Sequence, residues 1–434
     1  MNMQQFNEGL LAFLGEATTP FHAARSLERA CLDAGFVNAA ERSPEPGGPG
    51  VVVRQGGSVI ALRPGKNPLM SDGLRMVGAH TDSPCLMVKP APELKASGYQ
   101  QLGVQVYGGA LLNPWFDRDL SLAGRVSYAH PDGGVATALV DFRDPIAVIP
   151  SLAIHLDREA NSNRSVNAQT QMAPILATAA DGDDLDLRQL LAQQLQREGA
   201  VAEPVEVLDF ELCFYDTQGP ALVGLDQEFL ASARLDNLLS CYIGLQAMLQ
   251  TSEPGWSLLV CNDHEEVGSL SASGAQGPML RHFIQGLLQP GDSMAELMRR
   301  SMMISADNAH GVHPNYADKH DAKHGPVLNA GPVIKVNASQ RYASSSDGMA
   351  LFRLLARDLD LPVQSFVMRS DMACGSTIGP ITAGELGVTT LDVGVPTFGM
   401  HSIRELAGSR DGWTLQQILT AYFSIAGPPL NSGN

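Results

Sequence analysis

Acidic and histidine side chains stand directly after apolar runs at widely separated places in this chain. The motifs are VGAHTDSP, with His80 and Asp82, CNDHEEVG, with Glu265 and Glu266, SARLDN, with Asp236, SADNAH, with Asp307, and FGMHSIRE, with His401. Each run reads as a buried strand, except that Asp236 stands where a helix starts. The carboxyl ends of strands in an α/β sheet lie at the edge where such folds build active sites. Imidazole and carboxylate groups gathered there are zinc ligands, which indicates metal-dependent hydrolysis.

Five of these residues form a consistent ligand set for two metal ions. His80, Asp236 and Asp307 would hold one ion, and Asp236, Glu266 and His401 would hold the other, with Asp236 as the bridge. The carboxylates do not offset all the charge of two divalent ions, so the residual positive charge would lower the pKa of a bridging water and favour hydroxide. We expect two zinc ions per chain, and a site of this kind also accepts cobalt or manganese.

Two further carboxylates have predicted roles beside the ligands. Glu265 precedes Glu266, and neighbouring side chains in an extended segment point to opposite sides. One can therefore bind metal while the other takes a proton from water, which makes Glu265 the candidate general base. Asp82 lies two residues after His80 and could accept the second imidazole N–H, as carboxylates beside metal-binding histidines often do.

Each of these positions could also serve folding alone. A single Asp or Glu after a strand is commonly a helix cap or a solvated charge. HEEVG begins like the His-Glu-x-x-His motif of a metalloprotease helix, but Gly268 stands at the second His position, so His264 is not a predicted ligand. Four further histidines could form a second metal cluster, but we prefer the alternative that they lie in a structural loop. They are His310, His313, His320 and His324.

Composition excludes several classes of function. The net charge of −17 over 434 residues argues against binding to nucleic acid or to anionic membrane surfaces. We expect no secretory signal and no membrane span, because no basic start precedes an apolar core and no apolar stretch is long enough. The six cysteines are scattered without a Cys-x-x-Cys pair, which favours reduced thiols and a cytoplasmic location.

The elements that must position these residues alternate in a regular way. Residues 3–35 predict two helices, with Thr19-Pro20 opening the second, and residues 51–63 predict a hairpin. From residue 230 onward strands and helices alternate, which is typical of a mostly parallel sheet covered on both faces. Residues 91–229 instead show short alternating strands and a polar stretch. We therefore expect an α/β catalytic domain of residues 1–90 and 230–434, interrupted by a β-rich insert.

Longer ordered motifs point to a known family. The chain resembles the aspartyl aminopeptidase family of di-zinc metallopeptidases, close to its bacterial members, over nearly its whole length. The similarity is carried by GAHTDSPCLMVKP, WFDRDLSLAGRV, LAIHLDR, SARLDN, HEEVGS, SADNAHGVHPNY, GPVIKVNASQRYA, MACGSTIGP and MHSIRE. It implies the metal set above with Glu265 as the base, and removal of N-terminal Asp or Glu from peptides.

The resemblance also implies an architecture. It implies a three-layer catalytic domain interrupted by a β-rich dimerisation domain, and a dodecamer built from dimers with active sites facing an interior chamber. His155 in LAIHLDR matches a histidine that reaches a neighbouring subunit's active site, and the alternative is a histidine satisfied within the insert. The peptide bond between Asp236 and Asn237 matches a position that is cis in related enzymes.

An acidic first residue of the substrate would need a cation in its pocket. Lys335 in GPVIKVN is the first candidate, because it interrupts an apolar run, although a strand lysine with its head in solvent is the alternative. Arg341 and Tyr342 are weaker candidates. Backbone N–H groups for the same pocket are expected from Gly375, Ser376 and Thr377.

Two further functions compete with an acidic aminopeptidase. One is a di-zinc aminopeptidase or deacylase of broader scope. The second is a non-catalytic, cage-forming homologue, and the intact set of ligands together with Glu265 argues against it.

Overall fold

The computed structural model describes residues 1–179, 184–252 and 255–430, and its contacts divide the chain into two compact units. The catalytic unit comprises Met1–Asp82, Pro220–Met400 and Glu405–Asn434. The inserted unit comprises Ser83–Gly219 and His401–Arg404. The insert therefore begins at Ser83, where the sequence suggested residue 91, and ends at Gly219, where it suggested residue 229. A role of this unit in dimerisation stays a prediction.

The catalytic unit is built on a central sheet of nine strands in the described part of the chain. Its order is β1 (Val37–Asn38), β2 (Val51–Gln55), β3 (Ser58–Arg63), β13 (Ser257–Asn262), β4 (Arg75–His80), β14 (Met302–Ala306), β18 (Thr389–Gly394), β16 (Val333–Val336), β17 (Gln364–Val367). The pairs β13–β4, β4–β14 and β14–β18 are parallel, whereas the β2–β3 hairpin and the β16–β18 pair are antiparallel. The predicted mostly parallel sheet is confirmed.

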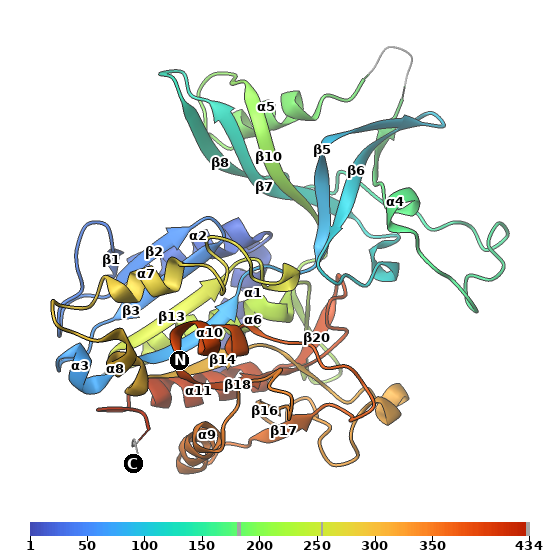
Figure 1. The fold of residues 1–434 in the computed structure, drawn as a ribbon. Coiled ribbons are helices and arrows are strands. Elements are labelled where there is room, and N and C mark those ends of the chain that lie inside the picture. Colours follow the sequence, from blue (N-terminus) through green and yellow to red (C-terminus); the bar gives the residue numbers. More distant parts are fainter. Residues whose placement is uncertain (180–183, 253–254, 431–434) are drawn as a thin grey trace. The chain divides into compact units, whose positions relative to one another are not determined.

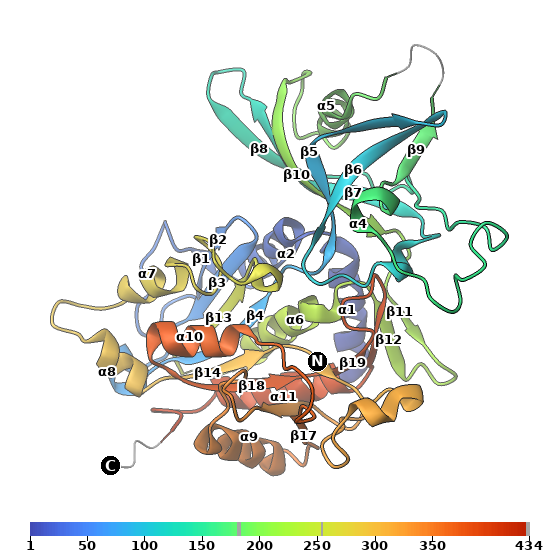
Figure 2. The same ribbon diagram turned by 45° about the vertical axis from the view of Figure 1, so that its right-hand side comes forward.

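Helices cover both faces of this sheet, which confirms the three-layer α/β class (Figure 1, Figure 2). One face packs against α1 (Met3–Glu16), α2 (Pro20–Asp33), α6 (Leu235–Gln250), α9 (Ser346–Asp358) and α11 (Asp411–Phe423). The other packs against α3 (Leu69–Asp72), α7 (Met279–Gln285), α8 (Met294–Arg299) and α10 (Ile378–Leu386). Because both faces are covered, the central strands β4, β13 and β14 are buried along their whole length instead of alternating between buried and exposed residues.

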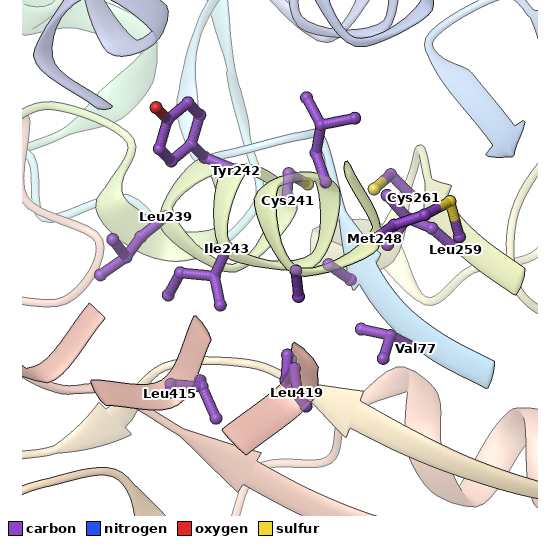
Figure 3. Close-up of a cluster of buried hydrophobic side chains, with 14 of the residues drawn as sticks. Val77, Leu239, Cys241, Tyr242, Ile243, Met248, Leu259, Cys261, Leu415 and Leu419 are labelled. Atoms are coloured by element: carbon purple, nitrogen blue, oxygen red, sulfur yellow. The ribbon is translucent and has the colours of Figure 1, made fainter. Parts of the chain in front are cut away.

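The helix α6 is buried on nearly every side, and this fixes the position of its first turn. Figure 3 shows Leu239 and Ile243 directed toward Leu415 and Leu419 of α11. Helices that are apolar all round occur in the cores of large proteins, and α6 follows that rule. Its first turn carries Asp236, so the packing of α6 holds that carboxylate in place.

Local signals predicted the N-terminal elements correctly. The Thr19 hydroxyl accepts the His22 N–H and Pro20 occupies the first helical position of α2, an arrangement that satisfies a free N–H of the first turn. The hairpin of β2 and β3 turns at Gly56-Gly57, as expected. None of the helices that the structure describes is long and apolar enough to cross a membrane.

The inserted unit is β-rich, as the sequence predicted. An antiparallel sheet of the described residues has the order β8 (Val135–Asp141), β7 (Leu120–Ala129), β10 (Val207–Asp216), β5 (Cys85–Ala96), β6 (Tyr99–Tyr107), β9 (Ile175–Thr178). The unit has its own apolar core and carries α4 (Ala168–Gln171), α5 (Leu187–Arg197) and the short 3-10 helix η1 (Asn113–Trp115). In the polar stretch of this insert, residues 180–183 lie outside the described residues.

A third sheet in the catalytic unit was not anticipated. Its order is β11 (Ala221–Val223), β12 (Phe229–Ser232), β20 (Glu405–Gly408), β19 (Pro396–Phe398), β15 (Ala309–His310). These strands are too short for a periodic pattern to reveal them. The antiparallel pairing of β12 with β20 brings the chain before α6 close to Glu405.

Candidate metal centre

Neighbouring parallel strands deliver the predicted ligands to one edge of the central sheet. β4 ends at His80, Asp307 follows the end of β14, and β13 leads into the 3-10 helix η2 (Glu265–Val267). The register pairs Asn262 of β13 with His80, so these strands end at the same level. The convergence predicted from their positions at the ends of apolar runs is therefore present in the structure.

Two groups of side chains in the catalytic unit are close enough to hold a metal ion. His80, Asp236 and Asp307 each offer one ligand atom, and these atoms lie within 4.8 Å of one another. The Nε2 atom of His80 is 3.3 Å from Asp236 Oδ1 and 3.6 Å from Asp307 Oδ1. A second group of the same kind comprises His80, Glu265 and Glu266.

The chemistry of this donor set fits a divalent cation. Burial, together with the charges of Asp307 and Asp236, raises the pKa of Glu265 to about 7, although the His80 charge opposes the shift. Burial by itself lowers the pKa of His80, but hydrogen bonds to Asp236 and Asp307 raise it well above its ordinary value. A bound cation would stabilise the charged form of these crowded, poorly solvated carboxylates. Carboxylate oxygen and imidazole nitrogen are also ligand atoms that zinc binds.

Asp82 contacts both the histidine and the two glutamates. The Nδ1 atom of His80 lies 3.0 Å from the backbone carbonyl oxygen of Asp82 and 3.4 Å from its carboxylate Oδ1. The carboxylate oxygens accept the backbone N–H groups of Glu265 and Glu266, each at 3.1 Å. The expected contact with His80 is present. No pattern in the sequence indicated that Asp82 also holds the start of η2.

The backbone of Asp236 is hydrogen-bonded to Glu405, a residue that sequence analysis missed. Its backbone N–H donates to Glu405 Oε2 at 2.9 Å, and Glu405 is buried on β20. The peptide bond between Asp236 and Asn237 is cis, as the resemblance implied. The side chain of Asn237 donates to the carbonyl oxygen of Ala306, the last residue of β14. No local motif could have revealed Glu405, because it acts through a pairing of two short strands far apart in sequence.

His401 lies in the short segment His401–Arg404, whose contacts assign it to the inserted unit. Its Nδ1 atom is 3.1 Å from the carbonyl oxygen of Gly109. Its role as a ligand of the second ion stays a prediction.

Lys335 lies next to a predicted metal ligand, Asp307. Its side chain on β16 is only 2% exposed, and its Nζ atom donates to Asp307 Oδ2 and to the carbonyl oxygen of Asn308, each at 3.1 Å. The same Nζ atom is 5.0 Å from the ring centroid of Tyr342, which is also buried. Lys335 is therefore not a solvated strand lysine, which was the alternative.

The remaining pocket candidates lie on two loops that contact each other. Arg341, Gly375 and Ser376 are exposed, and the Ser376 hydroxyl donates to the Arg341 carbonyl oxygen at 3.4 Å. The structure thus places one predicted pocket segment against the other.

The remaining histidines lie outside the metal groups of the described residues. His264 Nδ1 is 2.9 Å from the Ser271 hydroxyl. His324 pairs with Asp321 at 2.6 Å, in a stretch that also contains the 3-10 helix η3 (Pro314–Lys319), which favours a structural loop. His155 is exposed in a segment of the inserted unit without helix or strand.

Comparison with known proteins gives one consistent result. The family model described as aminopeptidase I zinc metalloprotease (M18) matches residues 13–423. A probable M18 family aminopeptidase 2 from Ectopseudomonas mendocina is 59% identical over 97% of this chain and 98% of its own length. A protein of the same description from Azotobacter vinelandii is 58% identical over 97% of this chain and 98% of its own length.

Solved structures agree with these relatives. The structure of the Ape4 and Nbr1 complex matches with a TM-score of 0.91 and 36% identity, over 97% of this chain and 86% of the other. The S. cerevisiae mApe1 dodecamer matches with a TM-score of 0.83 and 25% identity, over 98% of this chain and 97% of the other.

Proposed function

This chain belongs to the M18 family of zinc aminopeptidases, and from that premise we propose that it removes N-terminal aspartate and glutamate from peptides. The grouping of His80, Asp236 and Asp307 around one point, with Glu265 beside them, is the observation that carries the proposal. Membership of the family makes the protein a hydrolase. The preference for acidic residues is our inference from the pocket.

We assign the predicted ligands to two zinc ions. His80, Asp236 and Asp307 hold the first ion, while Asp236, Glu266 and His401 hold the second. When bound, the ions polarise the scissile carbonyl and lower the pKa of an attacking water. Asp82 and Glu405 act behind the ligands, because each accepts backbone N–H groups of the residues that hold metal.

Glu265 is the proton carrier in this proposal. It accepts a proton from the attacking water and later returns it to the amine that leaves. Two features support the assignment. Its carboxylate lies 4.0 Å from His80 Nε2, and burial keeps its pKa close to neutrality, where a group can both take and give a proton.

Lys335 is our candidate for recognition of the acidic side chain. An ammonium group has three N–H donors, and Asp307 and Asn308 accept two of them. Among the contacts of the described residues, this leaves one N–H for a substrate carboxylate next to the metal ligands. In such a poorly solvated place an ion pair is stronger than at the surface. Backbone N–H groups of Gly375 and Ser376, with Arg341 and Tyr342, would complete the pocket.

We also propose that the protein works as a dodecamer built from dimers. The known mApe1 dodecamer supports this, as does a run of exposed apolar side chains around His155. Leu152 is 57% exposed, Ile154 48% and Leu156 75%, a combination that favours burial against another copy. In that arrangement His155 would reach a neighbouring active site. The six free cysteines fit the reducing cytoplasm.

The decisive experiment compares wild type with Glu265→Gln and Lys335→Met on aspartyl, glutamyl and leucyl chromogenic substrates, with metal content measured for each protein. Exposed Glu203→Gln in the inserted unit is the matched control for Glu265→Gln. We expect wild type to prefer the acidic substrates. Glu265→Gln should keep its metal and lose at least ~100-fold in kcat, the lower end of what a general base contributes. Lys335→Met should lose the acidic preference.

Each alternative has its own outcome. Loss of metal from Glu265→Gln would make Glu265 a ligand and remove it as the base. A wild type that prefers the leucyl substrate would support an aminopeptidase of broader scope. A wild type with two metal ions per chain and no turnover of any substrate would indicate a non-catalytic, cage-forming homologue.

A further inference from the structure

A fully buried carboxylate lies behind the proposed substrate pocket without touching the metal groups. Asp392 is on the central strand β18 and is 0% exposed. Its Oδ2 atom accepts the backbone N–H of Ala343 at 2.6 Å, and its Oδ1 atom accepts the hydroxyl proton of Thr377 at 2.6 Å. A buried charge is costly unless it is compensated, and the Lys335 charge together with these two short hydrogen bonds offsets part of that cost.

The two groups that Asp392 holds belong to the two loops of the pocket. Ala343 follows Arg341 and Tyr342, while Thr377 follows Gly375 and Ser376. The Thr377 hydroxyl also accepts the Gly379 N–H at 3.3 Å, at the start of α10, so its single proton is committed to Asp392. The Asp392 carboxylate thus attaches both the loop after β16 and the loop before α10 to strand β18.

The same network reaches the backbone of Lys335. The Asp392 backbone N–H donates to the Ser344 hydroxyl at 3.1 Å, and that hydroxyl donates to the Lys335 carbonyl oxygen at 2.6 Å. The cation, the loop at residues 341–344 and the loop at residues 375–377 are therefore joined through a single residue of β18.

We propose that Asp392 is the positioning residue of the pocket for the first substrate residue, and that it acts through Thr377 and Ala343. The inference rests on the proposed preference for acidic substrates. Asp392 touches neither substrate nor metal ligand. It holds both loops and, through Ser344, the backbone of Lys335 in one arrangement.

The test uses Thr377→Val in the full-length, metal-loaded protein. This change removes the hydroxyl proton but keeps the shape of the side chain. We expect KM for an aspartyl substrate and the inhibition constant of L-aspartate to rise about tenfold, with kcat changed less than about twofold. Thr377→Ser retains the hydroxyl and should restore both constants. Thr382→Val is the matched control, because Thr382 is a buried threonine of the same helix whose hydroxyl has no hydrogen-bond partner among the described residues.

A second variant, Asp392→Asn, tests whether the pair acts as a unit. In asparagine an NH2 donor replaces one of the two carboxylate oxygens that accept these donors, so the single change should also raise KM. The double change of Asp392 and Thr377 should cost less than the product of the two single effects, because both remove the same contact.

The outcomes separate the inference from the function on which it rests. If wild type prefers acidic substrates but Thr377→Val leaves KM and L-aspartate inhibition unchanged, the positioning role is wrong and the function stands. A lower melting temperature with an unchanged KM would show that the contact serves only folding. If wild type does not prefer acidic substrates, both proposals are wrong.

Discussion

Asp82 illustrates how a single side chain can serve several neighbours at once. It contacts His80 and accepts the N–H groups of Glu265 and Glu266, so one buried carboxylate orients a predicted ligand on β4 and two residues after β13. Because both oxygens are used, a replacement with only one acceptor oxygen must leave one of these partly buried N–H groups without its partner.

We therefore predict that Asp82→Asn lowers kcat and metal affinity. Carboxylates behind metal ligands typically contribute 10–100-fold, and we expect a loss in about that range. Metal titration followed by kinetics on an aspartyl substrate at saturating zinc separates the two effects. Asp132→Asn, an exposed substitution in the inserted unit, is the control. If Asp82→Asn has the same kcat and the same metal affinity as wild type, the N–H contacts of Asp82 contribute nothing to the site.

At the scale of elements, α10 is a helix whose start is fitted closely to the sheet. A Cβ atom on Gly379 would lie 2.5 Å from both carboxylate oxygens of Asp392, so only glycine lets the helix approach this strand. Gly384, further along the same helix, has no heavy atom within 4 Å of such a Cβ position. The helix α10 thus contains one glycine that is crowded by the sheet, Gly379, and one that is not, Gly384.

Two alanine substitutions in α10 should have opposite effects on stability. Gly379→Ala should cost about 1–3 kcal/mol, because overpacking pushes the helix away from Asp392. Gly384→Ala should instead stabilise the protein by up to about 1 kcal/mol through helix propensity. Thermal unfolding of both variants beside wild type measures the difference. Equal effects would mean that the close approach at Gly379 does not constrain the helix.

Elements with strong local signals could be predicted from sequence. The Thr19-Pro20 start of α2 and the hairpin predicted over residues 51–63 are both present. The sheet of β11, β12, β15, β19 and β20 could not be found in this way. Its strands are two to four residues long, and pairing between distant segments, rather than any periodic pattern, defines them.

The same distinction applies to the candidate site. His80, Asp307 and Glu265 lie at or just after the ends of predicted parallel strands, so their meeting at one sheet edge was predictable. Glu405 and Asp392 were missed, because their partners are backbone N–H groups and a hydroxyl of remote segments. Nothing in the residues around them distinguishes such carboxylates from ordinary ones.

At the scale of the whole molecule, the exposed apolar run around His155 makes assembly testable. Leu156→Asp would place a charge where we expect a contact with another copy, and a buried unpaired charge is strongly unfavourable. We predict that wild type elutes with a mass near twelve times 46.2 kDa and that the variant forms smaller species. Light scattering after size exclusion measures both. Exposed Leu225→Asp in the catalytic unit is the control.

If Leu156→Asp assembles like wild type, this run is not an interface. If wild type itself is small, the proposed dodecamer is wrong. Neither result would affect the assignment of the metal ligands within the catalytic unit.

The division of the catalytic unit around the insert has a consequence for biosynthesis. His80 leaves the ribosome before the whole of Ser83–Gly219, while Asp236, Glu265 and Asp307 leave after it. A nascent chain therefore cannot assemble the centre until synthesis has passed the insert and reached Asp307. Contacts between residues so distant in sequence form slowly, since a long loop must close first. Most of the inserted unit, Ser83–Gly219, is made before that point, and newly made chains cannot hydrolyse peptides until that point in synthesis has been passed.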